Sequence, residues 1–321
     1  MKAYCGYSQN DSLLRQSASG GLATCMAQTT MKSGGICYGV SYTEDFKGAE
    51  YIRVTDEAGI FKLQSSKYIK AKMTKEILTS IGEDLNSGKQ VLVIGLPCEI
   101  GMVKGFLEKE GIPSEHLFTA DLICHGPTDP QVAETYITYL EQKYHSRVVK
   151  FSVRYKNPNW TPGYLFAEFE NSKRFLKKFF DTDYGTAFSM MPLEQCFHCA
   201  FKGDNHRADI TIGDYWGVDP SEDGYHKAGT SLALTHNEKA EAFLKELDGF
   251  TLCPADLEKA LRVNKWYHES IKKTKQREQF IKHYKQFGLK KAVAKHLGIK
   301  GRLKRALPES LLKSVRNIKK R

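Results

Sequence analysis

The central part of the chain alternates between two hydrophobic periodicities. Residues 91–96 form a continuous apolar run that predicts a buried strand, and residues 99–111 repeat apolar side chains at helical spacing. A second strand is predicted at 117–123 and a second helix at 129–144. Strands that alternate with helices of this length indicate a parallel sheet.

The flanking regions follow other patterns. Residues 12–33 predict a helix that opens at a glycine turn, and 35–43 predict a strand. Residues 148–157 and 164–171 alternate as antiparallel strands do. Further strands are predicted at 208–217, which ends in a turn, and at 230–236.

These elements predict an α/β fold: a mixed sheet with parallel βαβ units in the central lobe, followed by a helical C-terminal extension. We expect an N-terminal α/β lobe at residues 1–85 and a second lobe with a mixed sheet at 86–250. Residues 251–321 are predicted to form a basic helical tail.

Composition and charge limit the class of protein. The 321 residues are 41% hydrophobic and 26% charged, as in soluble globular proteins. The N-terminus lacks an apolar signal segment, and the longest apolar run is too short to span a bilayer, so we expect a cytoplasmic protein.

The net charge of +11 comes from the tail alone. Residues 271–321 contain 18 Lys or Arg and two acidic residues, which leaves 30 basic and 35 acidic residues in 1–270. The tail is expected to bind an acidic partner or the inner face of a membrane, or simply to solvate its helices. Nucleic acid is not expected, because the body is acidic and no base-reading module is recognisable.

Two of the eight cysteines follow predicted strands. In a cytosolic protein, recurrent cysteines favour metal binding or redox chemistry over disulfides. Cys98 and Cys124 each lie in a predicted loop just before a helix. Because successive strands of a right-handed βαβ unit are parallel, both loops fall on one edge of the sheet, about 5 Å apart if the strands are adjacent.

Cys196 and Cys199 add a CxxC pair. Together with Cys98 and Cys124 they make a complete ligand set for a 4Fe-4S cluster or, alternatively, for structural zinc. The other four cysteines lack a partner at ligand spacing and are predicted to have no ligand role; they are Cys5, Cys25, Cys37 and Cys253.

Several short segments are candidates for a second cofactor. In the SASGG segment, Ser17, Ser19, Gly20 and Gly21 precede a helix whose free N–H groups could receive a phosphate. The alternative is an ordinary serine cap of that helix.

The segment SSKY offers Lys67 for a phosphate and Tyr68 for stacking, with Ser66 beside them. A turn after the strand at 208–217 contains Gly213, Asp214 and, next to them, Trp216. An Asp in such a turn suits a ligand-facing loop.

Two further side chains are candidates by position. His125 directly follows a predicted ligand and is the candidate catalytic residue, tuning the cluster or carrying a proton. The alternative is a hydrogen-bonded loop histidine. Arg154 is a candidate phosphate partner, and the alternative is a charge on a strand surface.

The motifs SASGG, GGICYG, SSKY, GLPCE, ICHG, VRYKNPNW, CFHC and ADITIGDYWG occur in one characteristic order. In this order and spacing, residues 5–240 resemble the coenzyme F420 hydrogenase/dehydrogenase beta-subunit family. The resemblance implies an oxidoreductase subunit with a 4Fe-4S cluster on the four cysteines named above and with FAD. It also assigns six residues to the flavin pocket, namely Ser19, Gly20, Gly21, Ser66, Lys67 and Asp214.

The sequence departs from the longer members of this family, which carry a ferredoxin-like cysteine segment before SASGG. Only Cys5 precedes that motif here, so the resemblance implies a single cluster and a separate redox protein or subunit as electron donor or acceptor. The hydride acceptor is expected to be coenzyme F420 or an unidentified small molecule. Two alternatives stay open: a zinc-stabilised binding protein without redox function, and an accessory reductase of surface-polysaccharide synthesis.

Overall fold

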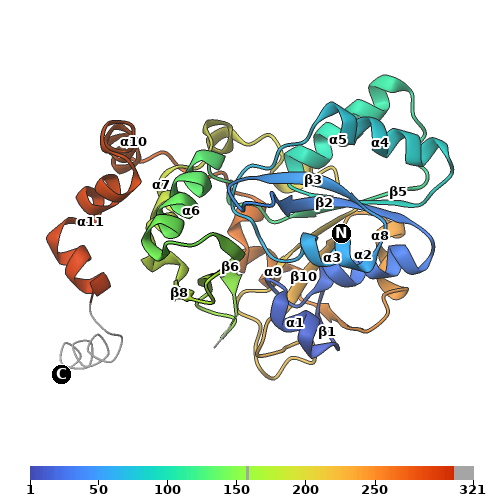
Figure 1. Cartoon of the computed structure of the whole chain (residues 1–321). Coiled ribbons are helices and arrows are strands. Elements are labelled where there is room, and N and C mark those ends of the chain that lie inside the picture. The colour runs from blue at the N-terminus through green and yellow to red at the C-terminus, as the bar shows by residue number, and fades with distance from the viewer. Residues whose placement is uncertain (157–158, 307–321) are drawn as a thin grey trace.

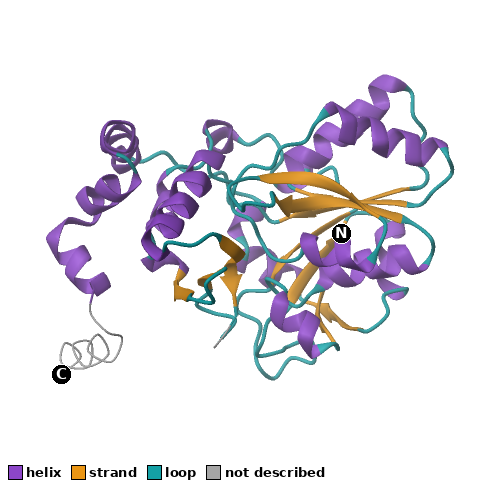
Figure 2. Cartoon of the chain, in the orientation of Figure 1, coloured by secondary structure: helices purple, strands orange, loops and turns teal. Residues whose placement is uncertain are grey.

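The centre of the protein is an eight-stranded mixed sheet (Figure 2). The computed structural model describes residues 1–156 and 159–306. The strand order is β11-β1-β10-β9-β5-β4-β2-β3. The strands are β1 (Lys2–Ser8), β2 (Ile36–Tyr42), β3 (Ala49–Val54), β4 (Val91–Gly95), β5 (Leu117–Leu122), β9 (Ile210–Asp214), β10 (Ser231–Thr235) and β11 (Phe250–Ala255).

The middle of this sheet is parallel, as the sequence predicts. Strands β2, β4, β5 and β9 pair in parallel, whereas β3, β10, β1 and β11 add antiparallel partners at the two sides. The α/β fold class with parallel central units is therefore confirmed. The main sheet takes strands from both sides of residue 86, and the predicted domain boundaries stay predictions.

Helices cover both faces of the main sheet. Successive side chains of a strand point to opposite faces, and here the apolar side chains on both faces are buried by helices. Cys37 and Leu92 pack with α1 (Asp11–Gln16), α2 (Leu22–Lys32), α3 (Glu57–Leu63) and α8 (Glu238–Lys245). Tyr38 and Val93 face α4 (Lys75–Asn86) and α5 (Pro97–Glu110), and α9 (Leu257–Val263) packs farther along the same face. Three cysteines with no predicted ligand role, Cys5, Cys25 and Cys37, are buried in these cores.

A second lobe lies beside the main sheet (Figure 1). Its elements are α6 (Pro130–Tyr144), β6 (Val148–Tyr155), β7 (Tyr164–Phe169), β8 (Arg174–Lys178), α7 (Asp183–Met190), α10 (Lys275–Phe287) and α11 (Leu289–Ala306). Short 3-10 turns connect the rest of the chain at η1 (Phe179–Asp181), η2 (Glu194–His198), η3 (Gly203–Asn205) and η4 (Lys265–Tyr267).

The expectation of one mixed sheet over 86–250 is wrong for the hairpin of this lobe. Strands β6, β7 and β8 form a separate antiparallel sheet. The physical reason is that α6 and α7 already cover its apolar face, where Phe151, Val153 and Leu165 are buried.

A helical C-terminal region is confirmed as far as residue 306, but residues 251–255 of the predicted tail belong to strand β11, which pairs with β1 at the edge of the main sheet. Residues 307–321 of the predicted tail lie outside the described residues. Within the described part of the chain, none of the helices has the length and apolar content needed to cross a bilayer.

Candidate functional site

Three candidate residues lie at or just beyond the carboxyl ends of neighbouring parallel strands. Gly95 of β4 pairs with Asp121 of β5, which pairs with Thr211 of β9. Counting three residues onward from each member of this row reaches Cys98, Cys124 and Asp214. Adjacent strands lie about 4.8 Å apart, so the register brings these residues to one edge of the sheet.

Cys98 lies in the first turn of α5 and not in the loop that the sequence predicts. Pro97 begins this helix, because a proline at the first helical position loses no hydrogen bond. The next residue, Glu99, is fully buried, accepts hydrogen bonds from Leu96 N (2.9 Å) and the Tyr51 hydroxyl (2.8 Å), and pairs with the Lys70 ammonium. This network fixes the first turn of α5.

The Cys124 loop lies against the CFHC segment. A side chain at Gly126 would place its Cβ 3.1 Å from Cys196 Cβ and 3.3 Å from Cys196 Sγ. The two segments are also joined by a hydrogen bond from Leu193 N to Pro127 O (3.1 Å). Cys196 is thereby held next to the loop that carries Cys124.

Residues after the CxxC pair fix this segment from the other side. Cys199 N donates to Ser270 Oγ (3.2 Å), and the Lys202 ammonium donates to Cys124 O (2.6 Å) and to Trp266 O (2.5 Å). Phe201 packs closely on Gly101 of α5, the helix whose first turn holds Cys98. All four candidate cysteines therefore belong to one connected group of loops.

The four thiols are close enough for their charges to interact. Burial raises the pKa of the Cys124 thiol to about 12, with smaller contributions from Cys98 and Cys196, while Lys202 opposes the shift. Burial likewise raises the pKa of Cys196 to about 11, and Cys98 and Cys199 add to it. The pKa of Cys98 is also raised by burial. Four thiolates in this position need a positively charged centre to be stable.

A single metal ion does not match this spacing. In residues 1–156 and 159–306, no three Cys, His, Asp or Glu side chains form a group that could hold one metal ion.

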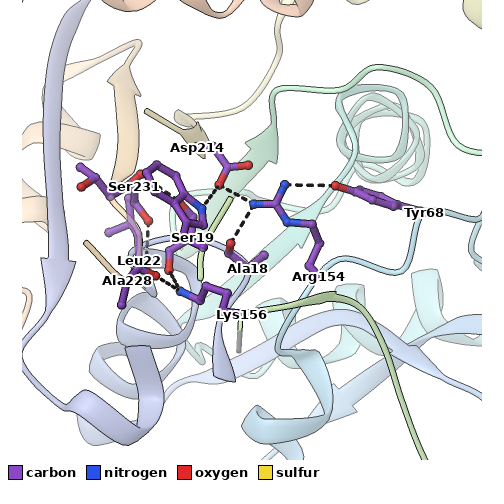
Figure 3. A network of polar contacts seen from close by, with 11 residues as sticks. Ala18, Ser19, Leu22, Tyr68, Arg154, Lys156, Asp214, Ala228 and Ser231 are labelled. Carbon is purple, nitrogen blue, oxygen red and sulfur yellow. Dashed lines mark hydrogen bonds and ion pairs between the residues drawn. The ribbon is translucent and has the colours of Figure 1, made fainter. Parts of the chain in front are cut away.

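A polar pocket continues the same sheet edge beyond Cys124, centred on Arg154 (Figure 3). The guanidinium donates to Asp214 (2.9 Å), to Ala18 O (2.9 Å) and to the Tyr68 hydroxyl (3.4 Å). Burial opposes its charge, but Asp214 and Tyr68 together outweigh burial and raise the pKa of Arg154. The strand-surface alternative for Arg154 is therefore wrong, since its side chain is only 10% exposed.

Lys156, two residues farther along the chain, lies in the same pocket. Its ammonium donates to Ser19 O and Ala228 O, both at 2.6 Å. Burial lowers the pKa of Lys156 to about 7. Figure 3 shows Arg154 and Lys156 reaching the SASGG segment from one side.

Both serine hydroxyls of SASGG hold the loop in place. Ser17 Oγ donates to Leu13 O and Ser19 Oγ donates to Thr230 O, each at 2.8 Å. Gly20 is required by close approach, because a Cβ there would lie 2.3 Å from Gly6 O. Gly21 has φ +91°, a left-handed conformation.

The first turn of α2 is left available by this arrangement. Gly21 caps the helix without a side-chain hydrogen bond, and Leu22 N has only a long contact of 3.5 Å with Ser231 Oγ. Helix N-termini attract anions. The serine-cap alternative is wrong, since neither predicted serine caps α2.

Aromatic side chains close the pocket around Asp214. Trp160 donates through Nε1 to Asp214 (3.1 Å) and stacks on Trp216 with ring centres 5.2 Å apart. The Arg154 guanidinium lies 5.4 Å from the Trp216 ring centre. Gly213 packs on Ile123, the residue before Cys124, so the pocket and the cysteine group share a wall.

Two residues of the SSKY segment make different contacts: Lys67 binds the end of α3, and Tyr68 contacts Arg154. The Lys67 ammonium donates to four backbone carbonyls of residues 62–65 near the C-terminal end of α3, at 2.8–3.2 Å. Burial lowers its pKa to about 7. The Tyr68 hydroxyl accepts a hydrogen bond from Arg154. Ser66 is half-buried. Of this motif, Tyr68 is the residue that joins the polar pocket.

His125 is packed between aromatic rings, with ring centres 5.1 Å from Phe188 and 4.7 Å from Trp266. Burial lowers its pKa, which favours the neutral imidazole. Its Nδ1 is buried and has no hydrogen-bond partner among the described residues. The alternative of a hydrogen-bonded loop histidine therefore has no support at Nδ1.

Two pocket residues were not singled out from the sequence, Lys156 and Trp160. The signal for Lys156 was the alternation of β6, because residues two apart face the same side of a strand and Arg154 was already a candidate. Residues 157–158, which precede Trp160, lie outside the described part, and no comparable pattern singled out Trp160.

Comparison with known proteins relates the whole arrangement to one family. Residues 88–251, just over half of the chain, match the family described as the C terminus of the coenzyme F420 hydrogenase/dehydrogenase beta subunit. No curated protein sequence matches the chain.

Among solved structures, the chain is similar to a chain of the F420-reducing NiFe hydrogenase complex from Methanosarcina barkeri, studied by xenon derivatization. The two share 16% sequence identity with a TM-score of 0.59, over 91% of this chain and 94% of the other. At this identity the likeness concerns the fold, while the sequence match assigns the family. The chain belongs to the coenzyme F420 hydrogenase/dehydrogenase beta-subunit family, which is a family of redox enzymes.

Proposed function

We propose that the protein is an iron-sulfur flavoprotein subunit that passes electrons between a 4Fe-4S cluster, FAD and a hydride acceptor. The observation that carries this proposal is the common register of Gly95, Asp121 and Thr211 on three adjacent parallel strands. Three positions after these residues come Cys98, Cys124 and Asp214. That register puts a sulfur-rich group and an anion-binding pocket side by side.

The thiol group suits a cluster better than a zinc ion. Zinc needs its four ligands about 2.0–2.3 Å from one point. A cluster of four irons and four sulfides keeps its cysteine ligands farther apart, because each thiolate binds a different iron. We assign the cluster to Cys98, Cys124, Cys196 and Cys199, whose thiols interact electrostatically with one another.

The polar pocket suits the phosphates of FAD. Arg154 and Lys156 supply positive charge, and the first turn of α2 supplies backbone N–H groups behind Gly20 and Gly21. The stacked Trp160 and Trp216 offer an aromatic wall to a planar ring. When bound, a flavin would exchange hydride with a small molecule and single electrons with the cluster.

The residues between the two sites have separate roles in this proposal. Asp214 orients Arg154, and Tyr68 holds the other side of its guanidinium. Neutral His125 lies beside the cysteine group and is the candidate for accepting or donating a proton there. The hydride acceptor is proposed to be F420 or another small molecule, and the electron partner a separate redox protein.

Anaerobic purification tests the proposal directly. We expect brown protein with about four irons and four sulfides per chain and one extractable flavin. Colourless protein with one zinc per chain and no flavin would contradict it and would favour the zinc-stabilised binding protein. Reoxidation of the reduced flavin by a panel of acceptors, including F420 and nicotinamides, then identifies the substrate class.

A further inference from the structure

The lobe formed by the small sheet and the last helices has an unusual surface of exposed apolar side chains. The described chain has nine large exposed hydrophobic residues, and five of them lie on β8, η1, α10 and α11. These five are Leu176, Phe180, Phe287, Ile299 and Leu303. A sixth, Val149, lies on β6 of the same lobe, and the rest of the described molecule, although larger, carries only three.

Helix α11 is interrupted at Gly298, whose φ of +60° and ψ of −174° are not helical. The part before the break is packed, whereas the part after it has an open side. Ala292 and Val293 are buried in the core shared with α6 and α7. Farther along, Ile299 is 71% exposed and Leu303 is 60% exposed. Residues four apart share one face of a helix, so these two side chains form an apolar strip on the open side.

The same strip is fixed next to a second exposed segment. Arg305 donates to Phe180 O (3.0 Å) and Thr186 Oγ1 (2.5 Å), and it pairs with Asp183. These contacts hold the end of α11 beside η1, where the Phe180 ring is 63% exposed. Two segments that are distant in sequence therefore contribute to one surface.

Both segments are strongly cationic. Residues 172–180 contain four Lys or Arg and no acidic residue, and the described residues 271–306 contain 13 Lys or Arg and one acidic residue, a net charge of +12. Residues 1–270 as a whole carry −5, so positive charge is concentrated on this side. Lys173 and Arg302 are exposed beside the apolar residues.

We propose that this surface, formed by Phe180, Ile299 and Leu303 with the surrounding cations, docks on an anionic lipid bilayer. Exposed apolar side chains among cations are the pattern of interfacial membrane binding. Of the 18 cations in residues 271–321, 13 are lysines. Protein–protein interfaces are depleted in lysine, whereas a lysine at a bilayer keeps its ammonium among the headgroups. The proposal does not depend on the cofactors.

Vesicle co-sedimentation of the full-length, anaerobically purified protein tests the docking surface. We expect pelleting with phosphatidylcholine vesicles that contain phosphatidylglycerol, little pelleting with phosphatidylcholine alone, and release by high salt. The double variant Ile299→Ser/Leu303→Ser should weaken binding to anionic vesicles by about tenfold, because both apolar side chains lose their insertion.

A matched control removes two exposed apolar side chains elsewhere, Phe61→Ser on α3 and Met102→Ser on α5, and should bind as the wild type does. Circular dichroism melting confirms that each variant is folded. Equal binding to neutral and anionic vesicles, no binding, or unchanged binding of the Ile299/Leu303 variant would overturn the proposal. Binding to soluble polyglutamate without vesicle binding would also overturn it, in favour of an acidic protein partner.

Discussion

The two halves of the sheet edge differ in how their charged groups are balanced. In the polar pocket, Arg154 is neutralised by Asp214, and Lys156 is surrounded by carbonyl oxygens. In the cysteine group, burial raises the pKa of three of the thiols, and their charges repel one another. The pocket is thus preorganised by the protein alone, whereas the cysteine group needs a bound cation or cluster to become charged.

This difference predicts how each half responds to substitution. Loss of a ligand in the cysteine group should remove the bound centre without much change to the fold. Loss of a charge in the pocket should destabilise the fold itself, because a partner is left buried and unpaired.

The largest effect is expected for Cys124→Ser. A hydroxyl is a poor substitute for a thiolate, so the variant should lose nearly all cluster iron, as measured by iron and sulfide analysis after anaerobic purification. Cys25→Ser is the matched control, since Cys25 lies on the buried side of α2, in a hydrophobic core that contains none of the four candidate ligands. Normal iron content in the Cys124→Ser variant would show that Cys124 is not a ligand of the cluster.

Arg154→Met should lower stability and flavin content together. It removes one partner of an ion pair whose side chains are 10% and 18% exposed. Breaking such a pair costs about 3–5 kcal/mol, measurable by urea unfolding. The double variant with Asp214→Asn should regain part of the stability without regaining flavin. Unchanged flavin content in either variant would contradict the pocket's assignment.

Gly126→Ala tests the contact between the Cys124 loop and Cys196. Gly126 has φ +122°, and the added Cβ would lie 3.1 Å from Cys196 Cβ. The strain of about 1–3 kcal/mol should reduce, but not abolish, the iron content. Gly111→Ala is a suitable control: it also has positive φ, and no atom lies within 4 Å of its added Cβ. If both variants keep full iron, the two loops do not need this close approach.

The smallest effect is a pH dependence that arises from Lys156. Burial lowers its pKa to about 7, so the group is an ammonium below that pH and increasingly a neutral amine above it. An anionic ligand binds the ammonium better, so FAD affinity should fall by about fivefold from about pH 6 to about pH 9. Lys156→Met should flatten this profile in fluorescence titrations. An equally steep profile in the variant would assign the dependence to another group.

Much of this edge was predictable because strand endings are visible in the sequence. The apolar runs before Cys98 and Cys124 predicted parallel neighbours, and β4 and β5 pair as expected. The proximity of Cys196 was less predictable, since it depends on a backbone contact between residues 127 and 193. Spacing of the CxxC pair indicated a ligand role but no position.

The pocket was harder to predict, because it is assembled from three distant segments. Arg154 comes from the small sheet, Ala18 from the SASGG segment and Asp214 from β9. The sequence pattern placed β6 in the same sheet as β9, which is wrong, and hence gave no reason for Arg154 to be buried beside Asp214. Contacts between segments that are distant in sequence produce no periodic pattern in the sequence from which they could be predicted.

Iron K-edge X-ray absorption of the anaerobically purified protein tests the central claim most directly. If the four cysteines hold one cluster, every iron should have sulfur-only coordination with a short iron–iron vector, and the signal should vanish in the Cys124→Ser variant. Iron bound through nitrogen or oxygen, or a zinc edge in place of iron, would contradict the account.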